Sequence, residues 1–454
     1  MKHLHAFLLI VAIICVGSFQ TLSAQIRTAY FMDKSIARTT LNPAFQAERS
    51  FVSIPGIGAF TLNAATDGLA INNLLYPDSE DKSLRTFLNS GQDPDKFLSA
   101  LHHKNKLSLD LRTDIVQVGW RTGTAFWTVG AAIRGGFQAT LPKDLFRFVT
   151  KAETGKYDMS ATGFDVSAWV ELSAGYSRPI NDKLTVGGKF KFLSGLGAAK
   201  VTFDRFDATL SDDIWTANAE GTLTAALPGD FKFKEDEDDE FITGLEGGSF
   251  SPAGFGAAVD LGATYQLLDN LTLSASILDL GFISWGKSAY AKSSIPNGGM
   301  ELNFEELNIL DGGGADKFTE QTDKLMELAH FYPSQEEKSL TTMLATTVLL
   351  GGEYTFFENK LGAGLLSTTR FNPLGIYTEL TASANYRPAN WFAASLSYSA
   401  VHSNFKTFGL AINFSPKGLN FFLGSDYMLT KVTPQFLPVS ATAANIHLGI
   451  AAQW

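Results

Sequence analysis

The sequence has almost no cysteine, little charge and no long apolar run beyond its first residues. Its 454 residues include one cysteine, Cys15, which lies inside an apolar stretch that we expect to be removed. We therefore predict a mature chain without thiols, which excludes disulfides, cysteine-type zinc clusters and thiol nucleophiles. Charged residues make up 18% of the chain and the formal net charge is -10, which argues against nucleic acid as a partner.

Helical membrane spans are also missing from the sequence. No stretch after residue 24 approaches the roughly 18 uncharged apolar residues that such a helix needs. Glycine and phenylalanine are abundant instead, with 41 and 36 residues, which suits short strands with an apolar outer face. Such a chain can cross a bilayer only as a closed β-barrel, because every backbone hydrogen bond must be made within the protein.

The first residues predict secretion. Lys2 precedes an apolar run over residues 6–16, and residues 23–25 are typical of a cleavage site. Leu22 stands where a small residue is usual, so the cut can shift by one residue. The run is shorter than the roughly 20 apolar residues of a membrane anchor. We predict a signal peptide over residues 1–24.

Apolar and polar residues alternate in segment after segment of the remaining chain. One such segment places Val166, Leu172 and Tyr176 on one face and Asp165 and Glu171 on the other. A period of two predicts β-strands, and the segments have about the 9 to 11 residues that a tilted membrane strand needs. A soluble β-sandwich also alternates, but the two ends of the chain favour a membrane barrel.

Fourteen strands are predicted, near residues 51–62, 107–121, 124–141, 163–179, 183–196, 253–268, 270–285, 343–357, 359–370, 375–387, 390–401, 404–415, 418–429 and 444–454. Tight turns are predicted at residues 122–123, 181–182, 269–270, 358–359, 388–389 and 416–417. Long connections are predicted over residues 63–106, 142–162, 197–252, 286–342 and 430–443. All tight turns then fall on one side of the barrel and all long connections on the other, as in outer-membrane barrels.

Some segments depart from this simple pattern. Residues 198–227 also alternate, and we interpret them as a hairpin beyond the membrane; counted as wall strands they give sixteen. Pro55 cannot donate a ladder hydrogen bond, so the strand at 51–62 is the weakest prediction. Residues 83–103 and 316–331 are predicted to be helical.

The last strand ends on an aromatic residue. Ile446, Leu448, Ile450 and Trp454 share one face, which is typical of a strand that faces lipid. This ending resembles the C-terminal assembly signal of bacterial outer-membrane β-barrels. The resemblance implies the outer-membrane assembly machinery as a partner, and we expect loss of Trp454 to slow insertion more than it destabilises the folded barrel.

Three sequence motifs suggest a ligand site, but the residues around each motif do not support one. Residues 281–288 match the phosphate-loop pattern literally, but Phe282 and Trp285 fill the loop and no helix is predicted after it. We interpret Trp285 as an interfacial aromatic at a strand end. The acidic run over residues 235–240 fits a solvated outer loop better than a calcium site, and residues 195–197 fit a bend or bulge in a strand.

The histidines of the mature chain have no nucleophile or metal-ligand spacing around them. His447 falls on the inward face of the last strand, where a polar side chain needs no catalytic explanation. We predict no catalytic, cofactor-binding or metal-binding residues, and therefore no enzyme.

Several segments resemble known barrels. Asn42, Pro43 and Ala44, within RTTLNPAF, resemble the N-P-A element near the N-terminal hatch of the outer-membrane long-chain fatty-acid channels. LDLGFISW at 278–285, LLGGEY at 349–354 and NWFAASLSY at 390–398 are similar to a family of unknown function from Gram-negative bacteria, built like those channels. The resemblance implies an outer-membrane barrel of about fourteen strands, without a substrate.

The combined prediction is an all-β, porin-like transmembrane barrel of the cell outer membrane. It has a signal peptide over residues 1–24, a short hatch-like segment over 25–50 and a barrel over 51–454. The leading functional hypothesis is passive uptake or binding of a small, apolar molecule. The alternative is a scaffold or secretion accessory whose outer loops bind an unidentified protein. Expected partners are outer-membrane lipid and lipopolysaccharide, the assembly machinery and the apolar ligand, but no nucleic acid.

Overall fold

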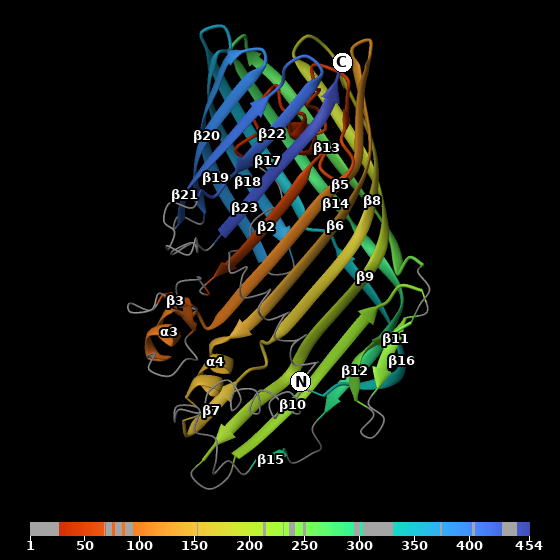
Figure 1. Cartoon of the computed structure of the whole chain (residues 1–454), viewed down its shortest axis with the longest axis vertical. Coiled ribbons are helices and arrows are strands. Elements are labelled where there is room, and N and C mark those ends of the chain that lie inside the picture. The colour runs from red at the N-terminus through yellow and green to blue at the C-terminus, as the bar shows by residue number, and fades with distance from the viewer. Residues whose placement is uncertain are drawn as a thin grey trace.

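The alternating segments form a closed antiparallel β-barrel with fourteen wall positions in the described part of the chain (Figure 1). The computed structural model describes residues 27–454 except 68, 70–74, 78–83, 87–93, 152, 212–214, 230, 236–240, 248–250, 295–299, 303–329, 373–374, 402–404 and 429–442. The predicted signal peptide lies outside the described residues. The predicted fold class and strand number are confirmed.

One wall position is shared by two short strands, β1 (Phe51–Ser53) and β2 (Phe60–Asp67). The other positions are β5 (Lys104–Thr122), β6 (Ala125–Pro142), β8 (Gly163–Pro179), β9 (Leu184–Leu210), β13 (Gly254–Leu268), β14 (Leu271–Ser294), β17 (Thr346–Phe356), β18 (Leu361–Asn372), β19 (Gly375–Ala389), β20 (Phe392–Val401), β21 (Phe405–Phe414), β22 (Leu419–Ser425) and β23 (Ala443–Gln453).

The ring closes between its first and last strands. Val52 of β1 lies opposite Ala452 of β23, and Phe60 of β2 lies opposite Leu448. The other side of β1 pairs with β5, where Phe51 lies opposite Gly119. Each wall strand thus has a hydrogen-bonded neighbour on both sides, as a strand inside a bilayer requires.

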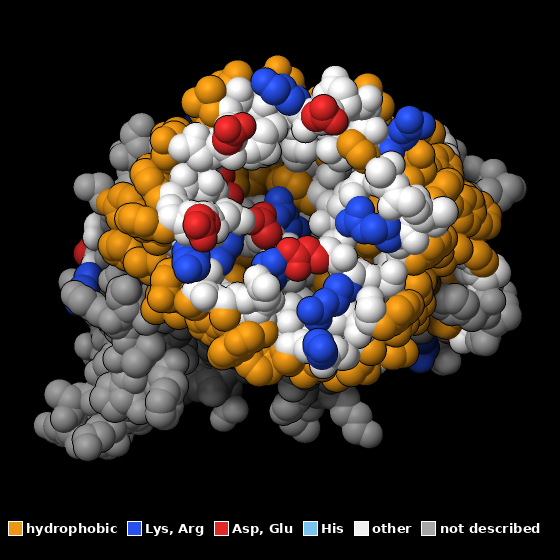
Figure 2. Space-filling model, turned by 90° about the horizontal axis from the view of Figure 1, so that it is seen from above, with side chains coloured by type: hydrophobic (Ala, Val, Ile, Leu, Met, Phe, Trp, Pro, Cys, Tyr) orange, Lys and Arg blue, Asp and Glu red, His pale blue; other side chains and the backbone are white. Residues whose placement is uncertain are grey.

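The alternation turns apolar side chains outward and polar ones inward. On β8, Val166 and Leu172 are exposed on the outside, while Glu171 is buried within the barrel. The view along the barrel from the tight-turn end shows hydrophobic side chains around the outer wall, with charged ones on the rim and in the central hollow (Figure 2). An apolar exterior around a polar interior is the arrangement of a barrel embedded in lipid.

The predicted division into tight turns and long connections agrees with the structure at all but one turn. The turn expected at residues 388–389 lies instead at 390–391, because β19 continues to Ala389, which pairs with Phe392. Pro388 falls near the end of this strand, where a missing N–H costs little. The tight turns and the C-terminus share one end of the barrel (Figure 1).

The other end of the barrel continues into a sheet beyond the wall (Figure 1). The second half of β9 pairs with β10 (Trp215–Ala226), which also pairs with the end of β14. The projecting hairpin predicted over residues 198–227 is therefore confirmed. β7 (Gly155–Asp158), β15 (Met300–Leu302) and β16 (Tyr332–Met343) add to this extension, and two small hairpins join β3 (Leu75–Pro77) to β4 (Leu84–Thr86) and β11 (Lys232–Glu235) to β12 (Ile242–Glu246).

Helices are few in the described residues. They are the 3-10 helix η1 (Ile36–Thr40), α3 (Pro94–Ala100) and α4 (Lys143–Thr150), and no described helix is long and apolar enough to cross a membrane. The helix predicted over 83–103 is correct at 94–100 and wrong at 84–86, which form β4 by pairing with β3. Most of the helix predicted over 316–331 lies outside the described residues.

Candidate functional site

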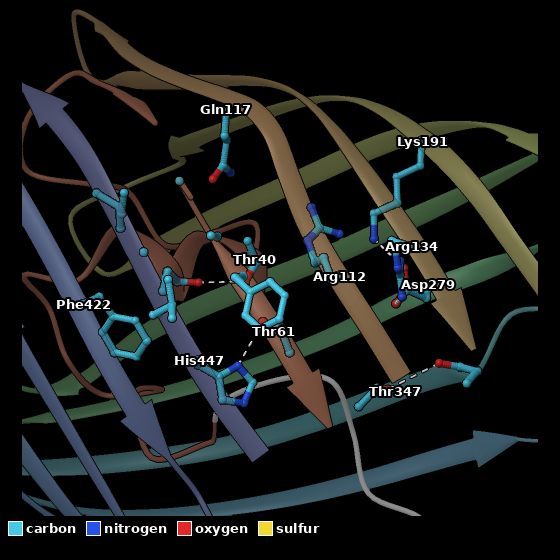
Figure 3. Close-up of a pocket in the computed structure, with 18 of the residues that line it drawn as sticks. Thr40, Thr61, Arg112, Gln117, Arg134, Lys191, Asp279, Thr347, Phe422 and His447 are labelled. Carbon is cyan, nitrogen blue, oxygen red and sulfur yellow. Dashed lines mark hydrogen bonds and ion pairs between the residues drawn. The ribbon is translucent and has the colours of Figure 1, made fainter. Parts of the chain in front are cut away.

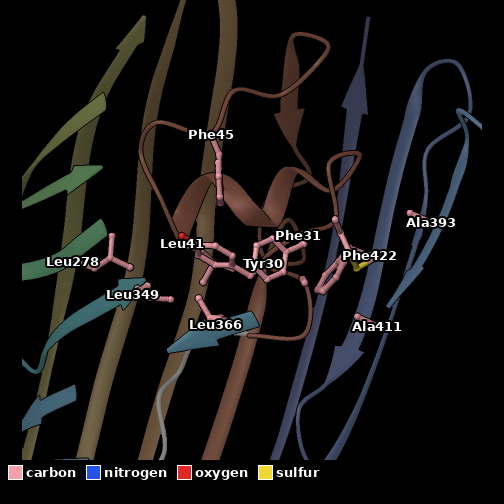
Figure 4. Close-up of a cluster of buried hydrophobic side chains, with 12 residues drawn as sticks. Tyr30, Phe31, Leu41, Phe45, Leu278, Leu349, Leu366, Ala393, Ala411 and Phe422 are labelled. Carbon is pink, nitrogen blue, oxygen red and sulfur yellow. The ribbon is translucent and has the colours of Figure 1, made fainter. Parts of the chain in front are cut away.

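The described N-terminal segment, residues 27–50, lies inside the barrel. Its Tyr30, Phe31 and Met32 are almost completely buried and pack with inward side chains from the wall, among them Leu278 of β14 and Phe422 of β22 (Figure 4). This cluster joins the segment to wall strands on different sides of the lumen. The lumen is therefore partly filled by the chain's own N-terminus.

Buried polar contacts hold the beginning of this segment. The backbone N–H of Thr28 and its hydroxyl both donate to Oδ1 of Asp426, at 2.8 and 2.7 Å. The Arg27 guanidinium pairs with Glu379 and donates to the Tyr427 hydroxyl. Both members of the Arg27–Glu379 pair are 2–3% exposed, so if one charge is removed, the other stays buried without solvation by water.

The predicted hatch motif anchors the other end of the segment. The Asn42 amide donates to the carbonyls of Ala275 at 3.1 Å and Ala263 at 3.4 Å, and its Oδ1 accepts from the Ala44 N–H at 2.9 Å. The wall makes room for the motif with glycine. A Cβ atom at Gly262 would lie 2.0 Å from Asn42 Oδ1, and one at Gly187 would lie 2.2 Å from the Pro43 carbonyl oxygen.

Charged contacts fix the turn that follows Met32. Arg387 of β19 donates to the Phe31 carbonyl and pairs with Glu353 at 2.5 Å and with Asp33 at 3.4 Å. Burial disfavours the charge of Asp33, but Arg38 and Arg387 outweigh it and hold the pKa of this carboxyl below its usual value. The segment is thus tied to the wall at residues 27–28, 31–33 and 42.

Contacts at the tight-turn end tie residues 46–49 to the rim. Arg121 donates to the Ala47 carbonyl at 2.9 Å, Gln46 to the Thr124 carbonyl at 3.2 Å, and Arg49 to the Pro416 carbonyl at 3.3 Å. Residues 46–49 therefore connect the β5–β6 turn to the β21–β22 turn, which lie on either side of the seam between β23 and β1.

Two adjoining cavities lie in the part of the lumen that the described residues form. The outer cavity has a volume of about 610 Å³ and mixes apolar residues such as Trp169, Met343 and Phe371 with charged ones such as Lys200. The inner cavity has a volume of about 70 Å³ and lies between η1 and the wall strands β2, β5 and β23 (Figure 3). Arg134 and Arg370 line both cavities, so the two spaces adjoin.

An ionic belt surrounds the junction of these cavities. It consists of inward residues on six successive wall positions: Arg112, Arg134, Glu171, Lys191, Asp260 and Asp279. Arg134 donates to Asp279 at 2.7 and 3.0 Å and to Glu171 at 2.8 Å. Five belt residues occupy inward positions of the alternation, whereas Asp279 is turned inward by an extra residue in β14.

The wall beside the inner cavity is interrupted at residues 54–59. Phe51 pairs with Gln453 and Phe60 with Leu448, so one strand advances nine residues while its neighbour advances five. Four residues, 55–58, are left over; residues 55–57 are exposed and Gly58 is buried. The stretch keeps backbone hydrogen bonds to Ile450 of β23 and Asp114 of β5. The predicted weakness of this strand at Pro55 is confirmed, and Gly58 to Thr61 line the cavity behind it.

Trp285 is not the interfacial aromatic that we predicted. It is 2% exposed, donates from Nε1 to the Thr342 hydroxyl at 2.9 Å, and its ring lies where a Cβ at Gly195 would clash at 2.4 Å. The alternation did not show that the Trp285 side chain lies on the inward face of this strand. Residues 281–288 lie within β14, so they do not form a phosphate-binding loop.

The remaining predicted positions fall as follows. The register between β8 and β9 shifts opposite Gly195 and Gly197, which confirms a bulge there. His447 is buried and faces the inner cavity, where its Nδ1 lies 3.0 Å from the Thr61 hydroxyl (Figure 3). Ile446 and Trp454 are exposed, and Leu448 and Ile450 are half-buried. Most of the acidic run lies outside the described residues.

Fold and site together define a transmembrane-type β-barrel with an apolar outer face, whose lumen is partly filled by its own N-terminal segment. The chain belongs to a family of unknown function, DUF5723, whose model matches residues 43–426.

Solved barrels with a similar course of the chain are distant in sequence. The Ralstonia pickettii toluene transporter TbuX is 11% identical, with a TM-score of 0.45, and the comparison covers 93% of this chain and 94% of that one. A Pseudomonas aeruginosa FadL homologue is 10% identical, with a TM-score of 0.44 and coverage of 96% and 99%. A comparison with curated proteins found no match.

Proposed function

We propose that this protein is a passive channel of the cell outer membrane that takes up a small hydrophobic molecule and releases it sideways through the wall. The observation that carries the proposal is the cavity behind the wall interruption. The molecule enters the outer cavity, passes the junction at Arg134, reaches the inner cavity and leaves at residues 54–59. Residues 46–49 occupy the seam side of the tight-turn rim, directly beside the inner cavity's wall, which favours the lateral route over the axial one.

The proposal assigns a role to each part of the chain. Residues 1–24 are a signal peptide, residues 25–50 act as a hatch that diverts cargo to the wall, and residues 51–454 form the barrel. The apolar outer face of the barrel contacts outer-membrane lipid and lipopolysaccharide, and Trp454 contributes to recognition by the assembly machinery. No catalytic step is part of this proposal.

Excision of residues 55–58 tests the lateral route. Because four residues are left over, their removal lets Ile54 and Ala59 continue one ladder along β23, and an even number keeps every side chain on its face. We expect a barrel that folds but no longer releases cargo. The measurement is uptake of 4-bromobenzyl alcohol by vesicles with lipopolysaccharide in the outer leaflet, for which the deletion variant should fall to the rate of protein-free vesicles.

Ile57→Ala is the matched control, because it keeps the length of the interruption and changes only an exposed side chain. It should retain wild-type uptake. Heat-dependent gel migration establishes that all three proteins are folded barrels. Uptake by the folded deletion variant at the wild-type rate would refute lateral release.

The extension beyond the wall supports a second candidate function, a scaffold for another surface protein. Its sheet has an apolar cluster of its own, in which Phe148, Tyr157, Phe206 and Leu210 are buried. A channel does not require a projecting sheet with its own core. Replacing residues 203–221 with a short turn tests this role, since a partner that copurifies with the wild type should be lost while uptake remains.

A further inference from the structure

The ionic belt lies where cargo on the proposed route must pass. Arg134 lines both cavities, while Arg112, Lys191 and Asp279 line the inner one (Figure 3). Any molecule that moves from the outer to the inner cavity therefore passes these charged groups. The chemistry of the belt then decides which cargo is accepted.

The belt carries no net charge and its cations are already bound. It contains three cations and three carboxylates, and adding the adjacent Lys189 and Asp114 keeps the balance even. Lys191 lies 2.7 Å from Asp260 and 2.6 Å from Asp279. Arg134 uses both terminal nitrogens on Asp279, in the forked geometry with which arginine binds any carboxylate.

Asp279 reaches the belt through an irregularity in its strand. Val259 pairs with Leu280 and Leu261 with Ile277, so β14 has one more residue than β13 over this stretch. Leu280 and Ile277 are exposed on the lipid side, whereas the two residues between them, Leu278 and Asp279, are both buried. Asp279 also has a φ of 57°, a conformation that is costly for a residue with a side chain.

We propose that Asp279 is a specificity-determining residue, which keeps the passage neutral so that it admits an uncharged amphipathic molecule and rejects a carboxylate of the same size. Asp279 occupies the positions on Arg134 and Lys191 that a cargo carboxylate would need. A carboxylate can bind there only by displacing it, whereas an uncharged molecule leaves the pairs intact. This inference rests on the proposed function and deepens it.

Two brominated probes of equal size test the inference. Binding of 4-bromobenzyl alcohol and 4-bromobenzoate to protein in lipid vesicles is followed by quenching of tryptophan fluorescence, since Trp169 lines the outer cavity and its ring lies 5.4 Å from the Arg134 guanidinium. Trp169→Phe identifies the signal. Wild-type protein should bind the alcohol at least about tenfold more tightly than the carboxylate.

Asp279→Asn and Asp279→Gly should both improve binding of 4-bromobenzoate about tenfold or more and leave binding of the alcohol nearly unchanged. The two variants remove the same charge, but glycine also relieves the backbone conformation, so agreement between them assigns the effect to charge. Glu353→Gln is the matched control. It removes a buried carboxylate that lines neither cavity, and should not improve carboxylate binding.

Equal affinity of the wild type for both probes, or an unchanged affinity ratio in both Asp279 variants, would overturn the inference. Failure of the proposed function looks different. In that case vesicles with wild-type protein take up the alcohol no faster than empty ones, while the binding preference and its reversal at Asp279 are still observed.

Discussion

At the scale of single residues, glycines in the wall decide how closely the N-terminal segment can approach. Gly262 and Gly187 leave the space in which Asn42 and Pro43 sit, and any side chain there overlaps the motif. Glycine at these positions acts through its missing Cβ rather than through backbone freedom. The alternation alone marks them as inward positions without saying what they face.

We expect Gly262→Ala to release the motif from the wall, because the new Cβ would lie 2.0 Å from Asn42 Oδ1. Loss of the amide contacts should destabilise docking of the segment by roughly 1–3 kcal/mol. Hydrogen exchange of residues 36–45 measures this, and should become faster while the barrel strands stay protected. Gly130→Ala, where the nearest atom would lie 3.4 Å away, should change neither.

Trp454 offers a second test at this scale. Its side chain is 68% exposed and its backbone N–H donates to the Ser50 carbonyl at 3.0 Å, so the folded barrel gains little from its ring. We expect deletion of Trp454 to slow insertion severalfold and to change the urea midpoint little. The time course of the folded gel band in the presence of assembly machinery measures the first, and normal insertion would contradict the expected role.

At the scale of elements, the start of the N-terminal segment is held by a buried arginine, Arg27, that pairs with two carboxylates. Arg27→Met leaves Glu379 and Asp426 buried without their cation, which should cost roughly 3–5 kcal/mol of docking free energy. Protease sensitivity of the segment measures the release. Combining Arg27→Met with Glu379→Gln should cost less than the two changes separately, because the double variant leaves fewer unpaired charges; additive losses would show that the two residues do not act as a pair.

The wall strands were predictable because each must turn one apolar face to lipid, so that apolar and polar residues alternate along the strand. Elements outside the wall lack that constraint. α4, β7 and β16 were predicted only as parts of long connections, although Phe148 and Tyr157 pack with Phe206 across the extension. The turn near Pro388 was misplaced by two residues because pairing with β20, and not proline, decides where β19 ends.

At the scale of the whole molecule, the alternation predicted the polar face for Arg134, Glu171 and Asp260 of the ionic belt, but neither their partners nor the inward turn of Asp279. Arg27 and Asp426 are 399 residues apart in the chain, and Arg134 and Asp279 are 145 apart. Such pairs depend on the order of strands around the ring and on bulges such as the one at Asp279. The sequence therefore showed the residue types of the site, but their pairing could be seen only in the closed barrel.

Closure of the ring also sets an order of events during assembly. The N-terminal segment directly precedes β1, and β1 and β2 pair with β23, which follows all the other wall strands in the sequence. The seam can therefore form only after the other wall strands have been made. The same seam contains the four extra residues at 55–58, so on the proposed lateral route the join that closes the barrel and the exit for cargo share one line along the wall.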